Sequence, residues 1–427
     1  MPADQTAPAT PAAKLGETDV TVIGAGVVGV NCALALVKEG FRVTIVDRLA
    51  PGEFCSHGNA GILSVWSFVP IFGPDVLKSV PKWLIDPTGP LTIRWTRLPQ
   101  ILPWLLRMLP KANAAHLKYA SDAMHHLTAA CADNYAKMAA EAGAPELVRH
   151  HPVLQVYDSE TDFQKAEKDL QFRATYGIKY DRLYRKALHD LEPELADRFQ
   201  WGHALLGGGT AANPGRLVKV LAEDFQRRGG KIIRADVRNI RHLQGGGVLI
   251  ETDGDYIRTD RLVVAAGAFS HRLSQGLGDH FPLGTERGYH AIVADPGVKV
   301  SHAVGWKSKA FFATPMEMGL RFAGTVELAG HDAAPNFKRA DLVAMHGRAM
   351  FPKMTGAVTS KWMGFRPSLP DSMPVVGPSE NIPGVYYAFG HQHVGLVCGP
   401  QTGRVIADLV AGRRPNFDIS PFRAGRF

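Results

Sequence analysis

Residues 20–47 read VTVIGAGVVGVNCALALVKEGFRVTIVD, and this stretch decides the fold. A run of β-branched residues leads directly into three glycines, Gly24, Gly26 and Gly29. A helical pattern of apolar residues follows and ends at a further glycine, and a second apolar run then ends in Asp47. The pattern predicts a strand, a tight turn, a helix and a second strand that carries an acid at its end.

Each of these residues has a chemical reason for its position. Gly24 permits the sharp turn between strand and helix, and Gly26 lets the backbone approach a pyrophosphate at the positive end of the helix. Gly29 lets the helix pack closely against the strand, and Asp47 can accept hydrogen bonds from a ribose. The stretch therefore predicts a dinucleotide site.

Length and composition describe a large globular protein. The chain has 427 residues, of which 45% are hydrophobic and 21% are charged, which is enough for two domains. The net charge is +8, but the basic residues are scattered and no nucleic-acid-binding module is recognisable, so we expect no nucleic-acid partner. An anionic substrate, an anionic cofactor or an acidic membrane surface suits the charge better.

Cysteine usage and the N-terminus bear on the compartment. The four cysteines lie far apart, without the spacing of a metal site or a disulfide framework, which is typical of a reducing compartment. Residues 1–16 lack the features of a signal peptide, so we expect a loose tail there. No apolar run reaches the roughly 18–20 residues that a membrane-spanning helix needs. We expect a cytoplasmic protein, with peripheral contact to the inner face of the cell membrane as an option.

The segment 78–118 is the reason to consider contact with a membrane. It holds seven lysines or arginines against a single acid, Asp86, and three tryptophans lie among them. Such a segment could rest on an anionic membrane and pass electrons to quinone. It could equally be ordinary domain structure whose basic side chains face water. Beyond it, the apolar spacing predicts a helix over 119–142.

Two further stretches contain groups that could hold a ligand. In AAGAFS, a buried strand ends in Ala266 and Gly267, so a cofactor could lie against bare backbone, although plain packing explains the pattern too. In GFRPSLPDSMPVVG (364–377), Arg366 lies between a glycine and a proline that stiffen the backbone. Its guanidinium could grip a carboxylate through two parallel hydrogen bonds, or face water from a proline-rich turn.

The stretch GHQHVGL (390–396) repeats the order of strand, glycine turn and helix. The helix N-terminus could stabilise negative charge on a cofactor ring. His391 and His393 suit either a metal or acid–base chemistry, but no other ligands cluster with them in the sequence. We expect histidines held in a turn and no metal.

These motifs, in this order, resemble the FAD-dependent D-amino-acid oxidase superfamily, and most closely its bacterial D-amino-acid dehydrogenase branch. The resemblance also extends through CSHGNAGILS (55–64), RGYH (287–290) and GLRFAGTVELAG (319–330), and covers nearly the whole chain. Around GFRPSLPD and the C-terminus the chain is similar to the hydroxyproline dehydrogenases that act on the D-isomer.

The resemblance implies an α/β fold, in which a Rossmann-like FAD-binding domain carries an inserted α+β substrate domain with a largely antiparallel sheet. The implied boundaries are 17–64, 203–285 and 361–427 for the FAD-binding domain, and 65–202 and 286–360 for the substrate-binding domain. FAD is the implied cofactor. By position, its contacts would be Gly24, Ala25, Gly26, Val27, Val28, Gly29, Asp47, Arg48, Ser56, His57, Asn59, Ala60, Gly61, Ile62, Val237, Ala266, Gly267, Gln392, His393, Val394, Gly395, Leu396 and Val397.

The resemblance also implies catalytic residues. Arg366 would bind the carboxylate of the substrate, and Tyr289 and His290 would lie on the substrate-domain side of the cavity. Many relatives have Gly-His-Gly where this chain has Gly390-His391-Gln392, so a side chain replaces a glycine beside the flavin. Cys55 precedes the loop under the flavin, where a covalent flavin bond is a minor alternative.

We therefore expect oxidation of a D-amino acid, with D-proline and hydroxy-D-proline types among the candidates. Arg366 would anchor the carboxylate while a hydride leaves Cα for flavin N5, and the electrons would pass to quinone or another acceptor. His290, His391 or water could take the amine proton. The alternatives are an oxygen-using amino-acid oxidase, a partner-dependent flavoprotein subunit of an oxidase complex, and an NAD-dependent dehydrogenase. The sequence leaves the oligomeric state open.

Overall fold

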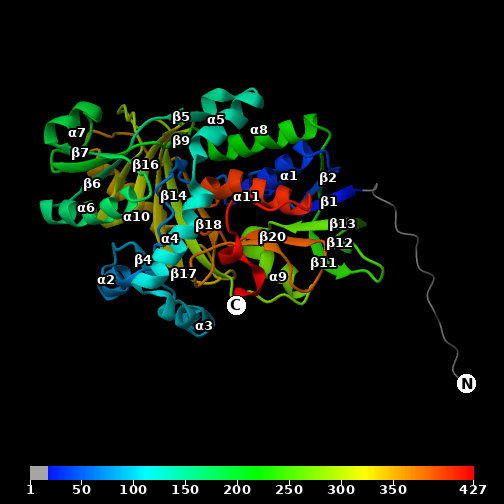
Figure 1. Cartoon of the computed structure of the whole chain (residues 1–427). Coiled ribbons are helices and arrows are strands. Elements are labelled where there is room, and N and C mark those ends of the chain that lie inside the picture. The colour runs from blue at the N-terminus through cyan, green and yellow to red at the C-terminus, as the bar shows by residue number, and fades with distance from the viewer. Residues whose placement is uncertain (1–17) are drawn as a thin grey trace, which may run out of the picture.

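The computed structural model describes residues 18–427, so the tail predicted for 1–16 lies outside the described residues. The described chain builds two large sheets and one small three-stranded sheet. The first large sheet lies at the right of Figure 1 and the second at the left.

The first sheet is built around the opening motif. β1 (Thr18–Ile23) lies between β2 (Val43–Asp47) and β13 (Tyr256–Val264), and all three are parallel. One half of β13 pairs with the parallel β20, and its other half pairs with the antiparallel β12. The remaining members are β10 (Lys231–Arg234), β11 (Val237–His242), β12 (Val248–Thr252), β19 (Val375–Pro378) and β20 (Val385–Phe389).

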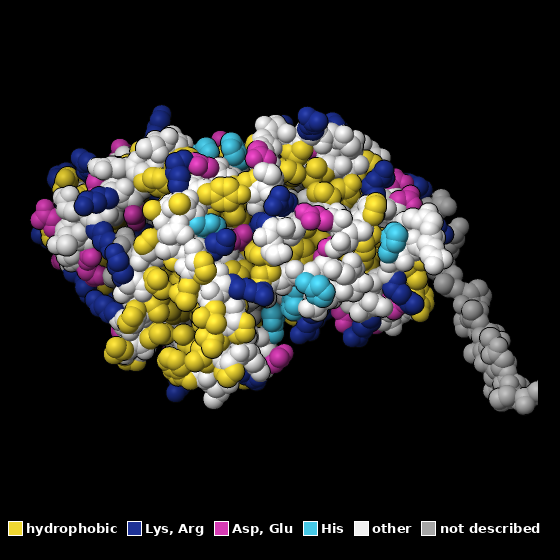
Figure 2. Space-filling model, turned by 60° about the horizontal axis from the view of Figure 1, so that its bottom comes forward, with side chains coloured by type: hydrophobic (Ala, Val, Ile, Leu, Met, Phe, Trp, Pro, Cys, Tyr) yellow, Lys and Arg dark blue, Asp and Glu magenta, His cyan; other side chains and the backbone are white. Residues whose placement is uncertain are grey.

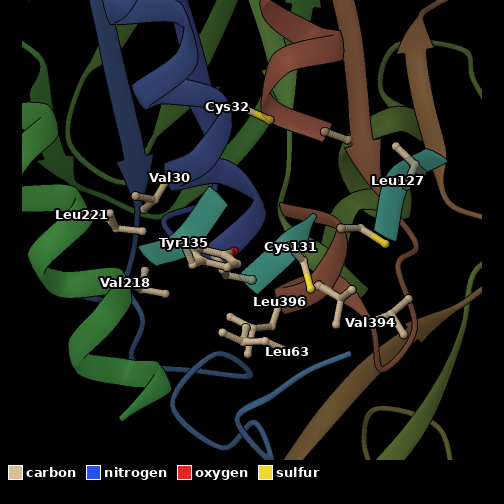
Figure 3. Packing of buried hydrophobic residues seen from close by; sticks show 14 of the residues in the cluster. Val30, Cys32, Leu63, Leu127, Cys131, Tyr135, Val218, Leu221, Val394 and Leu396 are labelled. Carbon is tan, nitrogen blue, oxygen red and sulfur yellow. The ribbon is translucent and has the colours of Figure 1, made fainter. Parts of the chain in front are cut away.

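Helices pack over this sheet and enclose the largest apolar core. Figure 3 shows Tyr135 at the centre of that core, with side chains of α1, α8 and the start of α11 around it. The buried Tyr135 hydroxyl accepts a hydrogen bond from Asn31 Nδ2 at 3.1 Å, so the phenol keeps a polar partner inside the core. The helices are α1 (Val27–Lys38), α4 (Ala114–Thr128), α5 (Cys131–Glu141), α8 (Pro214–Arg227) and α11 (Gly395–Val410).

The second sheet is largely antiparallel, in the order β18-β14-β17-β16-β15-β6-β8-β7, and β4 adds to β17. Among its strand pairs in the described part of the chain, only β15–β6 and β17–β4 are parallel. Its strands are β4 (Leu91–Ile93), β6 (Val153–Tyr157), β7 (Tyr180–Tyr184), β8 (Trp201–Leu205), β14 (Gly284–Val293), β15 (Val304–Trp306), β16 (Phe311–Met316), β17 (Gly319–Leu328) and β18 (Ser360–Ser368).

The small sheet packs against α5 and α11 of the first core, α9 lies beside β13 of the first sheet, and the remaining helices belong to the part of the chain around the second sheet. The small sheet is β3 (Ile62–Leu63), β9 (Gly209–Ala211) and β5 (Val148–His150). The helices are α2 (Pro74–Ile85), α3 (Leu98–Met108), α6 (Glu160–Ala174), α7 (Arg185–Leu191), α9 (Ser270–Gln275) and α10 (Lys338–Met350). Within residues 18–427, none of the helices is both long enough and apolar enough to cross a bilayer.

The predicted α/β fold, with a Rossmann-like sheet and a largely antiparallel second sheet, is confirmed. Two local expectations differ from the structure. The helix expected over 119–142 is two helices, because Ala130 takes a left-handed conformation (φ 52°) between α4 and α5. The segment expected to return to the first domain at 361 begins inside β18, which pairs with β14 from Ser360 to Ser368 in the second sheet.

Candidate active site

A cavity of about 1910 Å³ extends from the opening glycine turn to β14 and β18 of the second sheet. It takes in most of the residues predicted to contact the cofactor or substrate. Gly29, His57, Gly61 and His290 do not line it. The predicted residues that do are Gly24, Ala25, Gly26, Val27, Val28, Asp47, Arg48, Ser56, Asn59, Ala60, Ile62, Val237, Ala266, Gly267, Tyr289, Arg366, His391, Gln392, His393, Val394, Gly395, Leu396 and Val397.

The opening turn is held by backbone and carboxylate contacts. Gly24 has φ +115° and donates its N–H to Val46 O at 2.9 Å, a conformation that favours glycine. The Asp47 carboxylate accepts from the N–H of Ala25 at 2.7 Å and of Leu49 at 2.9 Å. The acid at the end of β2 therefore lies directly against the glycine turn, as the motif predicts.

Close to this turn, the walls leave space that fits an adenine dinucleotide. A Cβ added at Gly26 would meet only Ser56 Oγ, at 3.6 Å, and one at Gly267 would meet nothing within 4 Å. Bare backbone thus faces the cavity at both positions, and the N-terminus of α1 points toward it. Arg48 lies over the Phe269 ring, 4.5 Å from its centre, at the rim of the same space. These residues could hold the pyrophosphate and adenosine of FAD.

The loop that follows β2 is fixed from both sides. Ser56 Oγ accepts the Val27 N–H at 2.9 Å, which ties the loop to the start of α1. From β17, the fully buried Arg321 donates to the carbonyls of His57 (2.9 Å) and Asn59 (2.6 Å), and burial lowers the pKa of its guanidinium to about 10. His57 points its carbonyl at Arg321 and not into the cavity. Sequence reasoning missed Arg321, since an arginine in an apolar strand carries no sequence signal of what it binds.

Arg366 lies in β18 and faces the cavity. Its Nη1 donates to Thr325 O at 3.0 Å, and burial lowers the pKa of the guanidinium. Gly288 in β14 makes room for it, because a Cβ there would come within 2.6 Å of Arg366 Cζ. Thr325 is one of the residues of a β17 bulge and has φ +58°, which is rare for a β-branched residue. This strained carbonyl holds the arginine in place.

Tyr289 and His290 have partners of their own. The Tyr289 hydroxyl bonds Glu327 Oε2 at 2.5 Å and accepts the Asn336 N–H at 3.0 Å, so the phenol is part of a buried network. His290 bonds Gly58 O through Nδ1 at 3.2 Å and stacks on Trp362. Burial lowers the pKa of His290 to about 3, so the ring is neutral.

The second glycine turn closes the other side of the cavity. Gln392 has φ +50°, and its N–H donates to Pro367 O at 2.9 Å, which ties the turn to the end of β18. His391 Nε2 bonds Thr402 Oγ1 at 3.0 Å. Burial lowers the pKa of both His391 and His393 to about 3, and for His393 the Arg366 charge acts in the same direction. Among the described residues, no three acidic, histidine or cysteine side chains group as metal ligands would.

Cys55 lines the cavity, and its thiol already has a hydrogen-bond partner within the protein. Its thiol donates to Phe365 O at 2.9 Å, and burial raises the pKa of the thiol to about 12. At neutral pH it is therefore a protonated thiol and a poor nucleophile.

Comparison with known proteins identifies the family. The model of the family described as "FAD dependent oxidoreductase" matches residues 19–409. A protein of Bradyrhizobium diazoefficiens named D-amino-acid oxidase is 37% identical over 417 residues, which cover 96% of this chain and 98% of that protein.

Solved structures share the fold at lower identity. Glycine oxidase from Geobacillus kaustophilus has a TM-score of 0.74 at 20% identity, covering 96% of this chain and 99% of its own. L-proline dehydrogenase from P. horikoshii has a TM-score of 0.75 at 16% identity, covering 96% and 98%. Because the family model matches almost the full chain and the cavity walls suit the cofactor, the protein belongs to the FAD dependent oxidoreductase (DAO) family, and FAD is its cofactor.

Proposed function

We propose that the protein oxidises D-amino acids, with FAD as the electron acceptor at the site and Arg366 as the group that binds the substrate carboxylate. The observation that carries this proposal is a guanidinium that faces the same cavity as the glycine turns while a strained carbonyl fixes its direction. The relative named D-amino-acid oxidase supports the D-configuration. D-proline and hydroxy-D-proline are the side-chain types that we favour, from the similarity around GFRPSLPD.

The chain's own residues bind and orient the substrate. Bound FAD supplies the two-electron chemistry, so the protein has to hold Cα at the reacting distance and exclude competing groups. Arg366 fixes the carboxylate, and the neutral His391 and His393, which line the cavity, add no positive charge to the pocket that binds a cationic amine. This arrangement favours a substrate that carries one carboxylate.

The test removes the carboxylate anchor. Arg366→Gln should lower kcat/KM for D-amino acids by roughly 10- to 100-fold or more, because one charged hydrogen-bonded contact is worth about 1.5–3 kcal/mol. Turnover is measured on the isolated holoenzyme with an artificial dye and a panel of D-amino acids and their L-enantiomers. FAD content, read from the visible spectrum, should stay that of the parent protein. Unchanged kinetics, or preference for the L-series, would contradict the proposal.

We further propose that the electrons pass to a quinone at an anionic membrane. The cavity that begins at the glycine turns also touches apolar side chains of α2 and α3, including Val76, Val80 and Leu105. Leu106, which also lines the cavity, is 55% exposed, and Ile85, which does not, is 83% exposed. Figure 2 shows hydrophobic side chains gathered at the lower left, where these helices lie, with Lys and Arg nearby. An apolar surface with basic neighbours, open to the cofactor cavity, suits a lipid headgroup layer and a quinone.

Vesicle flotation tests this second proposal. The protein should float with vesicles that contain phosphatidylglycerol and remain behind with pure phosphatidylcholine, and high salt should weaken the binding. Replacing Leu102 and Leu106 of α3 by serine should reduce flotation. The matched control is Tyr184→Ser in β7, which removes a side chain of similar exposure (58%) elsewhere. Absence of binding at low salt would contradict membrane contact, and full turnover with oxygen alone would favour the oxidase alternative.

A further inference from the structure

An acidic side chain faces the cavity directly beside the arginine. In the antiparallel pair β14–β18, Glu286 is the register partner of Arg366, so their side chains leave the same face of the sheet. Both residues line the cavity. The next pair on that face is Gly288 with Gly364, which contributes no side chains. The Arg366 guanidinium occupies the space over Gly288 and the Trp362 ring that over Gly364, so the two charges stand where the sheet meets the cavity.

The pair does not neutralise itself by direct contact. Arg366 donates one hydrogen bond from Nη1 to Thr325 O, and its guanidinium lies over Gly288. Among residues 18–427, no ion pair joins Glu286 to Arg366 or to another base, whereas Glu327 on the neighbouring β17 pairs with Arg94 and Arg287. Burial raises the pKa of Glu286, while the Arg366 charge and a hydrogen bond from the Ser368 hydroxyl oppose that shift. A carboxylate whose protein partner is the neutral Ser368 and a guanidinium that donates to Thr325 O are thus held near each other, and each has hydrogen-bonding capacity left for a ligand.

We propose that Glu286 is the binding group for the substrate's ammonium, so that Glu286 and Arg366 together select a zwitterionic α-amino acid. In such a substrate the anionic carboxylate and the cationic nitrogen are joined through a single carbon, which matches two opposite charges on neighbouring strands. An α-hydroxy acid or an α-keto acid offers only the anionic end and leaves Glu286 buried without a cation, which is costly. The inference rests on the proposed function, and it adds the amine-binding group and the basis for rejecting acids without nitrogen.

The experiment uses two ligands of nearly identical shape. 2-Aminoisobutyrate has no α-hydrogen and cannot be oxidised, and pivalate carries a methyl group where it carries the ammonium. Their dissociation constants are measured by the change they cause in the visible spectrum of the FAD-loaded enzyme, without turnover. The parent protein should bind 2-aminoisobutyrate at least tenfold more tightly than pivalate. In Glu286→Gln this ratio should fall to near one, while pivalate binds as well as before or better.

Three variants make the outcome decisive. Glu286→Asp, with the charge retained, should keep part of the preference, and it serves if Glu286→Gln does not take up FAD. Glu317→Gln removes an acid that pairs with Arg216 outside the cavity, and it should leave the ratio unchanged. A ratio that stays high in Glu286→Gln, or equal weakening of both ligands, would overturn the role of Glu286. Arg366→Gln should weaken both ligands together.

The experiment distinguishes failure of the proposed function, in which Arg366 binds the carboxylate, from failure of the role of Glu286. If Arg366→Gln binds pivalate as the parent does, the carboxylate anchor of the proposed function is wrong, and the ratio still reports on Glu286. If the parent protein binds neither ligand, the amino-acid function is overturned and the role of Glu286 falls with it.

Discussion

A single strained residue holds the arginine of the site. Thr325 is β-branched, yet it takes φ +58° in the bulge of β17, a conformation that costs roughly 1–2 kcal/mol for a residue with a Cβ. Its carbonyl accepts from Arg366, so the strain coincides with a functional contact. The carbonyl direction is determined by the backbone, and the backbone is determined by the bulge.

Thr325→Gly separates strain from positioning. The variant should fold with unchanged or slightly higher stability, since glycine adopts this φ freely, while KM for D-amino acids rises several-fold because the carbonyl can rotate away from Arg366. Denaturant unfolding and steady-state kinetics measure the two effects. Ala130→Gly is the matched control, because Ala130 has φ +52° outside the cavity. A KM that stays the same in Thr325→Gly would show that the threonine carbonyl does not position Arg366.

The state of the Cys55 thiol predicts whether FAD is bound covalently. With its pKa raised to about 12 by burial, the thiol carries almost no thiolate below pH 9, so we expect FAD to be bound without a covalent link. Acid precipitation should release all yellow colour into the supernatant. Cys55→Ser should bind FAD to the same extent. Colour that remains with the precipitated parent protein, and is absent from the precipitate of Cys55→Ser, would contradict this expectation.

At the level of elements, two glycines in the same turn have different tasks. A Cβ at Gly29 would overlap the carbonyl of Gly24, 2.9 Å from its carbon, so α1 could no longer pack on β1. A Cβ at Gly26 meets only Ser56 Oγ at 3.6 Å, and it protrudes into the space for the pyrophosphate. We expect Gly29→Ala to unfold the first sheet and Gly26→Ala to fold but bind FAD more weakly. Thermal unfolding without FAD and FAD titration distinguish these outcomes, and equal stability of the two variants would contradict the argument.

The same elements indicate how far the sequence could predict the structure. The β1–α1–β2 unit was predicted with its acid because the β1–β2 pairing and the Ala25–Asp47 hydrogen bond both lie within the stretch 20–47. The placement of β18 was not, because its pairing with β14 joins residues that lie far apart in sequence, Glu286 and Arg366 among them. The break between α4 and α5 was not predicted either, because it occurs at Ala130, where neither glycine nor proline signals the end of a helix.

For the site residues, too, those marked by local sequence signals were predicted and those placed by strand pairing were not. The stretches quoted as motifs do meet in one cavity, and Arg366 faces it, because glycine and proline signals mark backbone that must come close to a ligand. Glu286, Thr325 and Arg321 were missed. An acid in an alternating strand reads as a solvent-facing residue, and a bulge or a buried arginine is created by strands that the local pattern cannot pair. Their roles depend on register, which only the assembled sheet defines.

For the whole molecule, the cavity makes the cofactor a link between the two large sheets. Its walls include the β1–α1 turn of the first sheet and β14 and β18 of the second, so we expect FAD bound in it to contact both. A ligand that binds only the folded state adds about 2.7 kcal/mol of stability at 100 times its dissociation constant. Added FAD should therefore raise the melting temperature of the apoprotein.

Hydrogen exchange locates this stabilisation. On addition of FAD, the amides of α1 and β2 and those of β14 and β18 should become protected together, because the second sheet supplies part of the wall around the cofactor. β7 and α7, which lie at the far end of the second sheet, should change little. The weak-binding variant Gly26→Ala should need more FAD for the same protection at both places. Protection confined to the first sheet would mean that FAD does not reach β14 and β18, and that Arg366 lies too far from the flavin to orient a substrate.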